Sequence, residues 1–306
     1  MIEVENVSKS YGTTQALQEV SFQVNAGEIV GLLGPNGAGK STAIKIITGY
    51  LQPDGGSVQV NGLDVLTQTR EVQAHLGYLP ENTPLYPDLS VQAYLRLMAD
   101  LREIPPAKQP ALFSRAIYAT ALEPYLTRPI GHLSKGLRQR VGLAQAIFHQ
   151  PKLIILDEPT VGLDPTQVVE MRTLIKRLST HSTILFSSHI LSEVEALCDR
   201  VIIIMNGQLR ADANLADLSA SEDVTLVLQE KQENVKSLLT LLKGVQKVEV
   251  IKQNHGYPTY RIVGKKNTDL SPMIYELARE HDWPLRELRR DVRTLESVFN
   301  ELASAG

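Results

Sequence analysis

A glycine-rich segment carries the clearest chemistry in the chain. Residues 34–41 read GPNGAGKS and match the pattern G-x-x-x-x-G-K-[ST], with an apolar run before it and a helix-like run after it. Glycines let backbone N–H groups turn toward an anion, and the following helix presents its positive N-terminus. We expect the loop to bind a triphosphate, with Lys40 neutralising its β- and γ-phosphates and the Ser41 hydroxyl ligating Mg²⁺. A chance glycine-rich turn is the alternative.

Two adjacent acids end an apolar segment further along the chain. Residues 153–158 read LIILDE, and an ionised carboxylate left unpaired in a core is costly. We expect Asp157 to hold the Mg²⁺ shell and Glu158 to act as a general base toward water. The alternative is a solvent-exposed acidic turn that caps the next helix. GTPase and kinase functions are disfavoured because N-K-x-D, H-R-D and D-F-G motifs are missing from the sequence.

The elements that must position these residues indicate an α/β fold. Strand-like runs cover residues 1–33, and near-continuous apolar runs at 153–157, 183–188 and 201–205 are typical of a parallel sheet buried on both faces. Helix-like patterns fill the region from about 90 to 150 and form a helical insert. We therefore predict one α/β core over residues 1–218 that contains this helical subdomain.

The pattern of strand- and helix-like segments changes past residue 218. Strand- and helix-like segments follow in the order β-α-β-β-α-β, which favours a ferredoxin-like split unit. We predict a small C-terminal α+β accessory domain over residues 219–306.

Bulk properties restrict where the protein works. The 306 residues carry a net charge of −3, so no general attraction to nucleic acid is expected. A single cysteine, Cys198, excludes an intrachain disulfide and suits a reducing cytosol. The longest apolar runs are strand-sized, far short of the roughly 20 residues that span a bilayer. At a membrane, such a chain would have to dock onto a partner that crosses it.

A second anion site is predicted where residues 132–140, HLSKGLRQR, open a helix. At this point the chain resembles the ATPases of ABC transporters. Five segments in order are similar to their Walker A, signature, Walker B, D-loop and switch-histidine motifs, namely Gly34–Thr42, Leu133–Leu137, Leu153–Glu158, 161–164 and 187–189. The resemblance covers roughly residues 2–215 and implies a P-loop NTPase (RecA-like) core with an antiparallel β subdomain and a helical subdomain.

The resemblance also implies roles for individual residues. Tyr11 would stack on adenine, although a surface tyrosine at a strand end is the alternative. His189 would contact the γ-phosphate, where the alternative is a polar strand-end histidine. ATP would be held by the whole first motif, Gly34, Pro35, Asn36, Gly37, Ala38, Gly39, Lys40, Ser41 and Thr42.

The family's architecture further implies a dimer. Ser134 and Gly136 would bind the γ-phosphate held by a second subunit, either a second copy or a paralogous ATPase, because the family's signature and P-loops face each other head to tail. Asp164 would link the two sites. A monomer would then hold only half of each catalytic site.

Two motifs depart from the family pattern, at three positions. The signature reads LSKGL rather than LSGGQ, which places Lys135 and Leu137 at unusual positions. Glu81 stands where the family commonly has glutamine, and its carboxylate would meet the metal–water shell while adding negative charge near ATP. Both substitutions resemble the ABC-2-type exporter subset, which serves drug, polysaccharide and gliding-motility systems.

The expected function is thus an ATPase subunit that powers an exporter. Its partner would be a multispanning permease, and it would lie in the cytoplasm, peripheral to the inner face of the cell membrane. The alternatives are a soluble ABC ATPase acting on ribosomes or DNA, and an importer ATPase.

Overall fold

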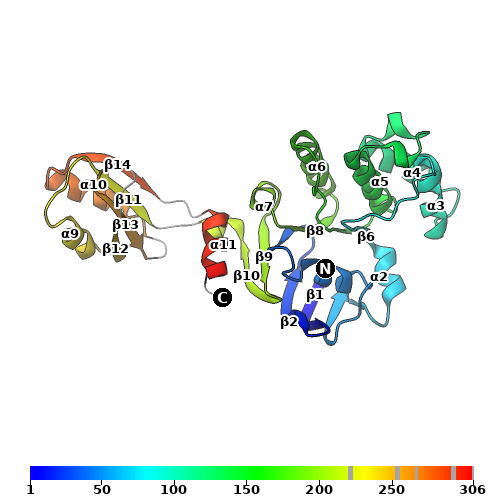
Figure 1. Ribbon diagram of the computed structural model, residues 1–306, viewed down its shortest axis with the longest axis horizontal. Helices are drawn as coiled ribbons and strands as arrows, with labels where there is room; N and C mark the ends of the chain where they lie inside the picture. The colour runs from blue at the N-terminus through cyan, green and yellow to red at the C-terminus, as the bar shows by residue number, and fades with distance from the viewer. Residues whose placement is uncertain (220–222, 252–255, 266–267, 291–293, 305–306) are drawn as a thin grey trace. The chain divides into compact units, whose positions relative to one another are not determined.

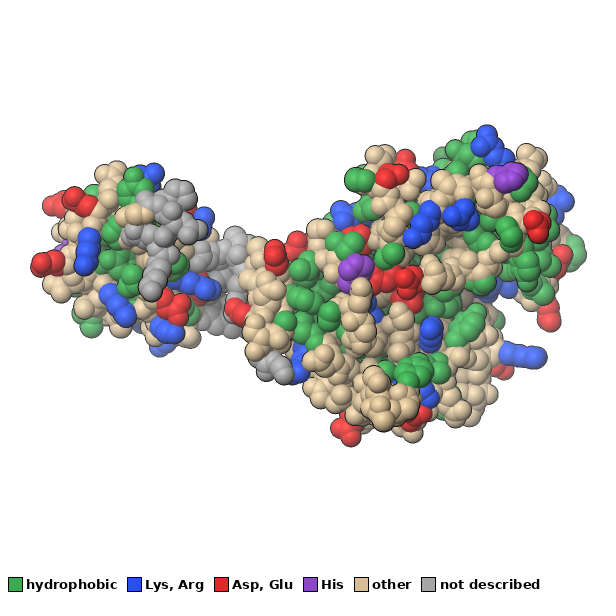
Figure 2. All heavy atoms as spheres, viewed as in Figure 1, with side chains coloured by type: hydrophobic (Ala, Val, Ile, Leu, Met, Phe, Trp, Pro, Cys, Tyr) green, Lys and Arg blue, Asp and Glu red, His purple; other side chains and the backbone are tan. Residues whose placement is uncertain are grey.

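The computed structural model of the protein describes residues 1–219, 223–251, 256–265, 268–290 and 294–304. The chain divides into two compact units, residues 1–215 and 216–306, and each is described by itself (Figure 1). On the face shown in Figure 2, Lys and Arg side chains are interspersed with Asp and Glu. No described helix combines the length and the apolar character needed to cross a membrane.

A six-stranded sheet forms the centre of the first unit. Its strand order is β10-β9-β3-β8-β7-β6, and all neighbours are parallel except β10, which runs antiparallel to β9. Every residue of β3, β7 and β8 is buried, which is why their sequences are nearly continuous apolar runs. The strands are β3 Ile29–Leu33, β6 Leu76–Leu79, β7 Leu153–Leu156, β8 Thr183–Ser188, β9 Arg200–Met205 and β10 Gln208–Asn214.

A second, antiparallel sheet shares its core with the first. Its order is β2-β1-β4-β5, and its apolar side chains pack with those of helix α1 and the central sheet in one buried cluster. This is the antiparallel subdomain that the family resemblance implied. The elements are β1 Ile2–Tyr11, β2 Thr14–Val24, β4 Gly55–Val60, β5 Leu63–Asp64 and α1 Lys40–Ile47.

The remaining helices of the first unit include a cluster with a core of its own. Helices α3, α4 and α5 enclose buried side chains such as Leu95, Ile117 and Val141, and two short 3₁₀ turns lie between α4 and α5. Ser90 caps α3 by accepting a hydrogen bond from the Ala93 N–H at 3.2 Å. The helices are α2 Thr69–His75, α3 Val91–Leu101, α4 Gln109–Thr120, α5 Lys135–Ile147, α6 Pro165–Leu178 and α7 Leu191–Leu197, with turns at Glu123–Tyr125 and Ile130–His132.

The second unit is built on a four-stranded antiparallel sheet. Its order β12-β13-β11-β14 inserts β13 between β11 and β12, which is the split arrangement expected of a ferredoxin-like unit. Its core is apolar, with Leu226, Ile262 and Ile274 fully buried. The elements are β11 Val224–Leu228, α9 Val235–Leu241, β12 Val245–Ile251, β13 Thr259–Gly264, α10 Ser271–Glu280, β14 Leu285–Arg290 and α11 Leu295–Ser304; α8 Leu215–Ser219 spans the boundary between the units.

Candidate functional site

A loop joins the central strand β3 to helix α1 and can form only with glycine at certain positions. Gly39 precedes the helix with φ 107°, a left-handed conformation that other residues rarely adopt. A Cβ on Gly39 would clash with the Ala16 carbonyl oxygen, and one on Gly34 would clash with the Ile204 carbonyl oxygen. The glycines of this motif therefore let the loop pack tightly against β2 and β9 while its N–H groups precede a helix N-terminus.

The Lys40 ammonium is held at the wall of this loop. It donates hydrogen bonds to the carbonyl oxygens of Gly34, at 2.8 Å, and Pro35, at 3.2 Å. It also lies 3.3 Å from Oε1 of Glu158. Both members of this ion pair are buried, so their attraction is little screened by solvent. The lysine is thereby held beside the loop that surrounds the cavity.

Two serines converge on the carboxylate of Asp157 at the end of β7. The hydroxyls of Ser41, at 3.1 Å, and Ser187, at 2.7 Å, both donate to its Oδ1. Burial raises the pKa of Asp157, and the hydrogen bonds from the two serines act in the opposite direction. Carboxylate and hydroxyl oxygens are hard donors of the kind that Mg²⁺ prefers, so this donor set fits a magnesium ion.

Glu158 adopts an unusual backbone conformation that turns it into the site. Its φ is 48°, in the left-handed region that is sparsely populated by residues with a Cβ. Its N–H donates to Ser187 Oγ at 2.9 Å, and its Oε2 accepts from Nδ1 of His189 at 2.9 Å. The carboxylate therefore lies between Lys40 and His189, where it can accept a proton from water.

These groups surround one cavity of about 490 Å³. It lies at the carboxyl ends of the parallel strands, the edge where open α/β sheets bind ligands. Gly34 and Pro35 are adjacent to it through their contacts with Lys40, and Asp157 through its contact with Ser41. The cavity is lined by Tyr11, Ala16, Asn36, Gly37, Ala38, Gly39, Lys40, Ser41, Thr42, Glu81, Glu158, Val161 and His189.

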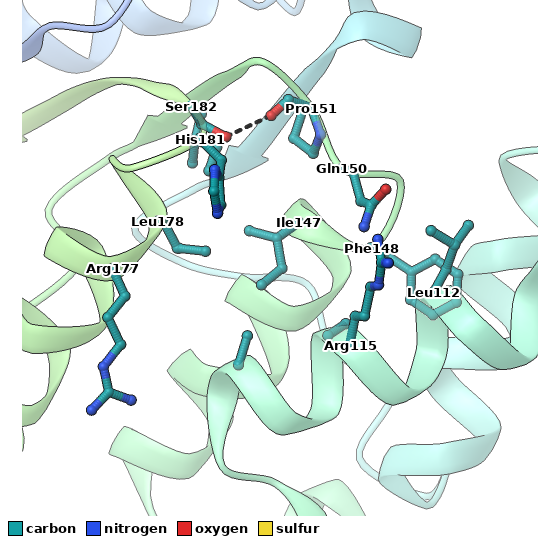
Figure 3. Close-up of a pocket in the computed structure, with 13 residues that line it drawn as sticks. Leu112, Arg115, Ile147, Phe148, Gln150, Pro151, Arg177, Leu178, His181 and Ser182 are labelled. Atoms are coloured by element: carbon teal, nitrogen blue, oxygen red, sulfur yellow. Dashed lines mark hydrogen bonds between the residues drawn. The ribbon is translucent and has the colours of Figure 1, made fainter.

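A second cavity, of about 420 Å³, lies at the opposite strand ends and lacks this chemistry. It is formed where α4 and α5 approach the segments that precede β7 and β8, and no acidic residue is among the described residues that line it. Figure 3 shows Ile147 and Leu178 directed toward its interior and Arg177 directed away. The Ser182 hydroxyl there donates to the Pro151 carbonyl at 2.7 Å (Figure 3). We therefore place the candidate site at the first cavity.

Ser134, Gly136 and Asp164 lie away from the first cavity. Ser134 caps α5 by accepting from the Leu137 N–H at 3.3 Å. Gly136 is buried against α6, where a Cβ would clash with the side chain of Gln167. Asp164 caps the same helix α6 through the Gln167 N–H at 2.9 Å. The signature segment thus meets the segment after Glu158 and helix α6 rather than the chain's own phosphate loop.

Three contributors were not predicted as site residues. Ala16 and Val161 line the cavity, and Ser187 connects Asp157 with the backbone of Glu158. Only Ser187 left a signal in the sequence, because a hydroxyl at the end of the apolar run 183–188 is as unusual as the acids at the end of 153–158. The two small apolar residues are ordinary in type, and only the fold brings them to the cavity.

The sequence of this chain is similar to those of ABC transporter ATP-binding proteins. The sequence pattern described as ABC transporter matches residues 17–161. The uncharacterized ABC transporter ATP-binding protein YdbJ of Bacillus subtilis is 37% identical over 293 residues, which cover 92% of this chain and 94% of that protein. The Nod factor export ATP-binding protein I of Rhizobium etli is 35% identical over 218 residues, covering 71% and 69%.

A solved structure described as the ATP binding subunit of an ABC transporter has the same fold. It matches with a TM-score of 0.65 at 34% sequence identity, over 71% of this chain and 91% of that chain.

Proposed function

This chain belongs to the family of ABC transporter ATP-binding proteins, and from that premise we propose that it is the motor subunit of a membrane exporter. It is an ATPase, which converts ATP and water to ADP and phosphate. One observation carries the assignment of the reaction to this cavity. A carboxylate in a left-handed turn, Glu158, is held between the Lys40 ammonium and the His189 imidazole beside the glycine-rich loop.

Each group of the cavity has a proposed task. Lys40 and the loop N–H groups bind the β- and γ-phosphates, and Tyr11 supplies a ring for the adenine at the open side of the cavity. Glu158 takes the proton of the attacking water. The Nδ1–H of His189 donates to that carboxylate and fixes its orientation, and a ring that carries hydrogens on both nitrogens can also donate from Nε2–H to the γ-phosphate.

Oxygen donors from three segments of the chain suit a magnesium ion. Ser41 and Asp157 would hold Mg²⁺, with Glu81 in reach of its water shell. When bound, the ion neutralises charge on the phosphate oxygens. Ser187 keeps the Asp157 carboxylate oriented through its 2.7 Å hydrogen bond.

We propose that the active form is a dimer, with a second copy or a paralogous ATPase. Ser134 and Gly136 lie outside the cavity of their own chain, so their proposed contact with the γ-phosphate requires a second subunit in head-to-tail arrangement. ATP favours the closed dimer because it contacts both subunits only in that form, and hydrolysis reverses the shift.

The experiment that tests the exporter function is affinity purification of the full chain from native membranes. We expect a multispanning membrane protein to co-purify and to stimulate ATP hydrolysis, with the chain recovered at the cytoplasmic face. Co-purification of rRNA or DNA instead would indicate a soluble ABC ATPase. Recovery of a solute-binding protein would indicate an importer. The Nod factor export protein among its relatives favours export.

The C-terminal region has a proposed accessory role. We assign residues 219–306 to a regulatory or dimer-supporting module, a proposal supported by the separate sheet and apolar core of that region. Deleting residues 219–306 is expected to weaken dimerisation or change the ATPase rate. Unchanged values of both would remove the proposal.

A further inference from the structure

A cavity of about 400 Å³ adjoins the nucleotide cavity and shares one wall with it. Glu81, which follows strand β6, lines both. On its far side the adjoining cavity is lined by Lys135 and Arg138, both from the first turns of helix α5. Two of the three positions at which this chain departs from its family's pattern, Glu81 and Lys135, therefore line one cavity with opposite charges.

Glu81 is the acid of the nucleotide cavity that has no cation of its own. Lys40 and His189 both contact Glu158, and neither forms an ion pair with Glu81. Within the described residues, Glu81 makes no ion pair at all. A triphosphate in the neighbouring cavity adds negative charge beside this carboxylate, and like charges at close range repel. A cationic side chain on the other wall of the adjoining cavity would offset this repulsion and orient the Glu81 carboxylate.

Lys135 is the available cation. Its side chain extends over Gly162, where Cε and Cδ lie 3.1 and 3.3 Å from the position that a Cβ would occupy. Gly162 has φ 72° and belongs to the turn that begins at Glu158. Lys135 forms no ion pair with any residue that the structure describes. Arg138 is less free, because its Nη1 donates to the Leu133 carbonyl at 2.6 Å.

We propose that Lys135 pairs with Glu81 across this cavity and so holds the Glu81 carboxylate in position beside ATP. Both side chains are exposed, and the four rotatable bonds of lysine let the ammonium swing from Gly162 toward the carboxylate. Lys135 is thus a positioning residue that acts through Glu81, and it links the start of α5 to the nucleotide cavity. This inference rests on the proposed function, since it places ATP in that cavity.

A double-mutant cycle on the full chain tests the pair. The variants are Glu81→Gln, Lys135→Gln and the two combined, and the measurement is the Kd for Mg·ATP at low and at high salt. At low salt, we expect the Kd of the double variant to differ by about threefold or more from the value obtained by multiplying the effects of the two single changes. The discrepancy should shrink as salt rises because the pair is exposed. Lys135→Arg, which keeps the charge, should retain the coupling.

Lys176, an exposed residue in the last turn of α6, provides the matched control. Lys176→Gln combined with Glu81→Gln should give effects that multiply within about twofold. The same cycles are run on thermal unfolding without nucleotide. If no variant and no wild-type protein binds ATP, the proposed function fails, while coupling in unfolding would still support the pair. If the effects of Glu81→Gln and Lys135→Gln are independent in both ATP binding and thermal unfolding, the proposed Lys135–Glu81 pair is overturned.

Discussion

The two units of the chain each hold an acid against a base, in different surroundings. In residues 1–215, Lys40 Nζ lies 3.3 Å from Glu158 Oε1, and the exposed fractions of the two side chains are 6% and 7%. In residues 216–306, Arg261 Nη2 lies 2.9 Å from Asp223 Oδ2, with exposed fractions of 35% and 12%. The shorter pair is therefore the more exposed one.

The difference in burial between the two ion pairs indicates which of them belongs to a functional site. Removing two charges from water costs several kcal/mol for each ion, so a buried pair is weak evidence for stability. A pair with one partly exposed member is better solvated, so it costs less and contributes less. The Lys40–Glu158 pair is buried at the edge of a sheet beside a glycine-rich loop, where both groups are available to a ligand. The Arg261–Asp223 pair joins a residue of strand β13 to the residue before β11, in a sheet that packs on an apolar core.

The largest expected effect follows from replacing the buried lysine. Lys40→Ala removes the cation that meets the β- and γ-phosphates, so ATPase activity should fall by about 10³-fold or more. Lys247→Ala is the matched control, because Lys247 pairs with Glu249 on the second unit's surface. It should leave turnover unchanged. Near-normal ATPase activity of Lys40→Ala would contradict the assignment of the buried Lys40–Glu158 pair to the catalytic site.

Replacing the buried acid should separate binding from hydrolysis. Glu158→Gln keeps the shape of the side chain but removes the base, so turnover should fall by about 10²-fold or more while ATP still binds. Sedimentation with Mg·ATP should then detect a long-lived dimer. Wild-type turnover in this variant would exclude Glu158 as the base.

The sequence predicted the groups of this site better than their mutual contacts. Lys40, Asp157 and Glu158 each stand in a local pattern, a glycine-rich loop or an apolar strand that ends in acids. The pairing of Lys40 with Glu158, and the hydroxyl of Ser187 between the two acids, depend on strands β3, β7 and β8 lying side by side. Neighbouring strands come from distant parts of the chain, so periodicity alone does not reveal these contacts.

The sequence also predicted some elements of the fold and missed others. Buried strands such as β7 are continuous apolar runs, and the order of segments past residue 218 indicated the split sheet. Helix α2 and strands β6 and β10 were not predicted. Strand β6, LGYL, contains a glycine and follows α2 directly, so it lacks the continuous apolar run of β7. Strand β10 lies at a sheet edge with mostly polar, partly exposed residues, so it leaves no apolar pattern.

An intermediate effect concerns a buried base outside the cavity. Burial lowers the pKa of His149 from 6.5 to about 4, and its Nε2–H donates to the Leu76 carbonyl at 3.1 Å. Between these pH values the unfolded chain binds a proton that the folded chain does not. Folding stability should therefore fall as pH drops from 6.5 toward 4, by about 3 kcal/mol in total.

His149→Gln should remove that part of the pH dependence. Denaturant unfolding of both proteins between pH 7 and pH 4 measures it, with the wild-type curve steeper in this window. Parallel curves would mean that His149 accepts its proton in the folded protein at the ordinary pH.

The smallest effect is expected at the exposed pair. Arg261→Met should lower the free energy of unfolding of the second unit by about 1 kcal/mol or less, since solvent screens the partly exposed guanidinium and the Asp223 carboxylate still accepts from the Gly264 N–H. ATP binding should not change. Denaturant unfolding and an ATP titration together measure this. A loss of several kcal/mol would show that the exposed pair matters more to stability than its surroundings indicate.

The nucleotide cavity draws its walls from Tyr11 through to His189, so it exists only when nearly all of the first unit is folded. ATP at 100 times its Kd should stabilise that unit by about 2.7 kcal/mol, because the unfolded chain has no such cavity. No described residue of the C-terminal unit is part of the lining. In a calorimetric scan, nucleotide should therefore move one melting transition and leave the other where it was, so that each half of the chain can be followed in the same sample.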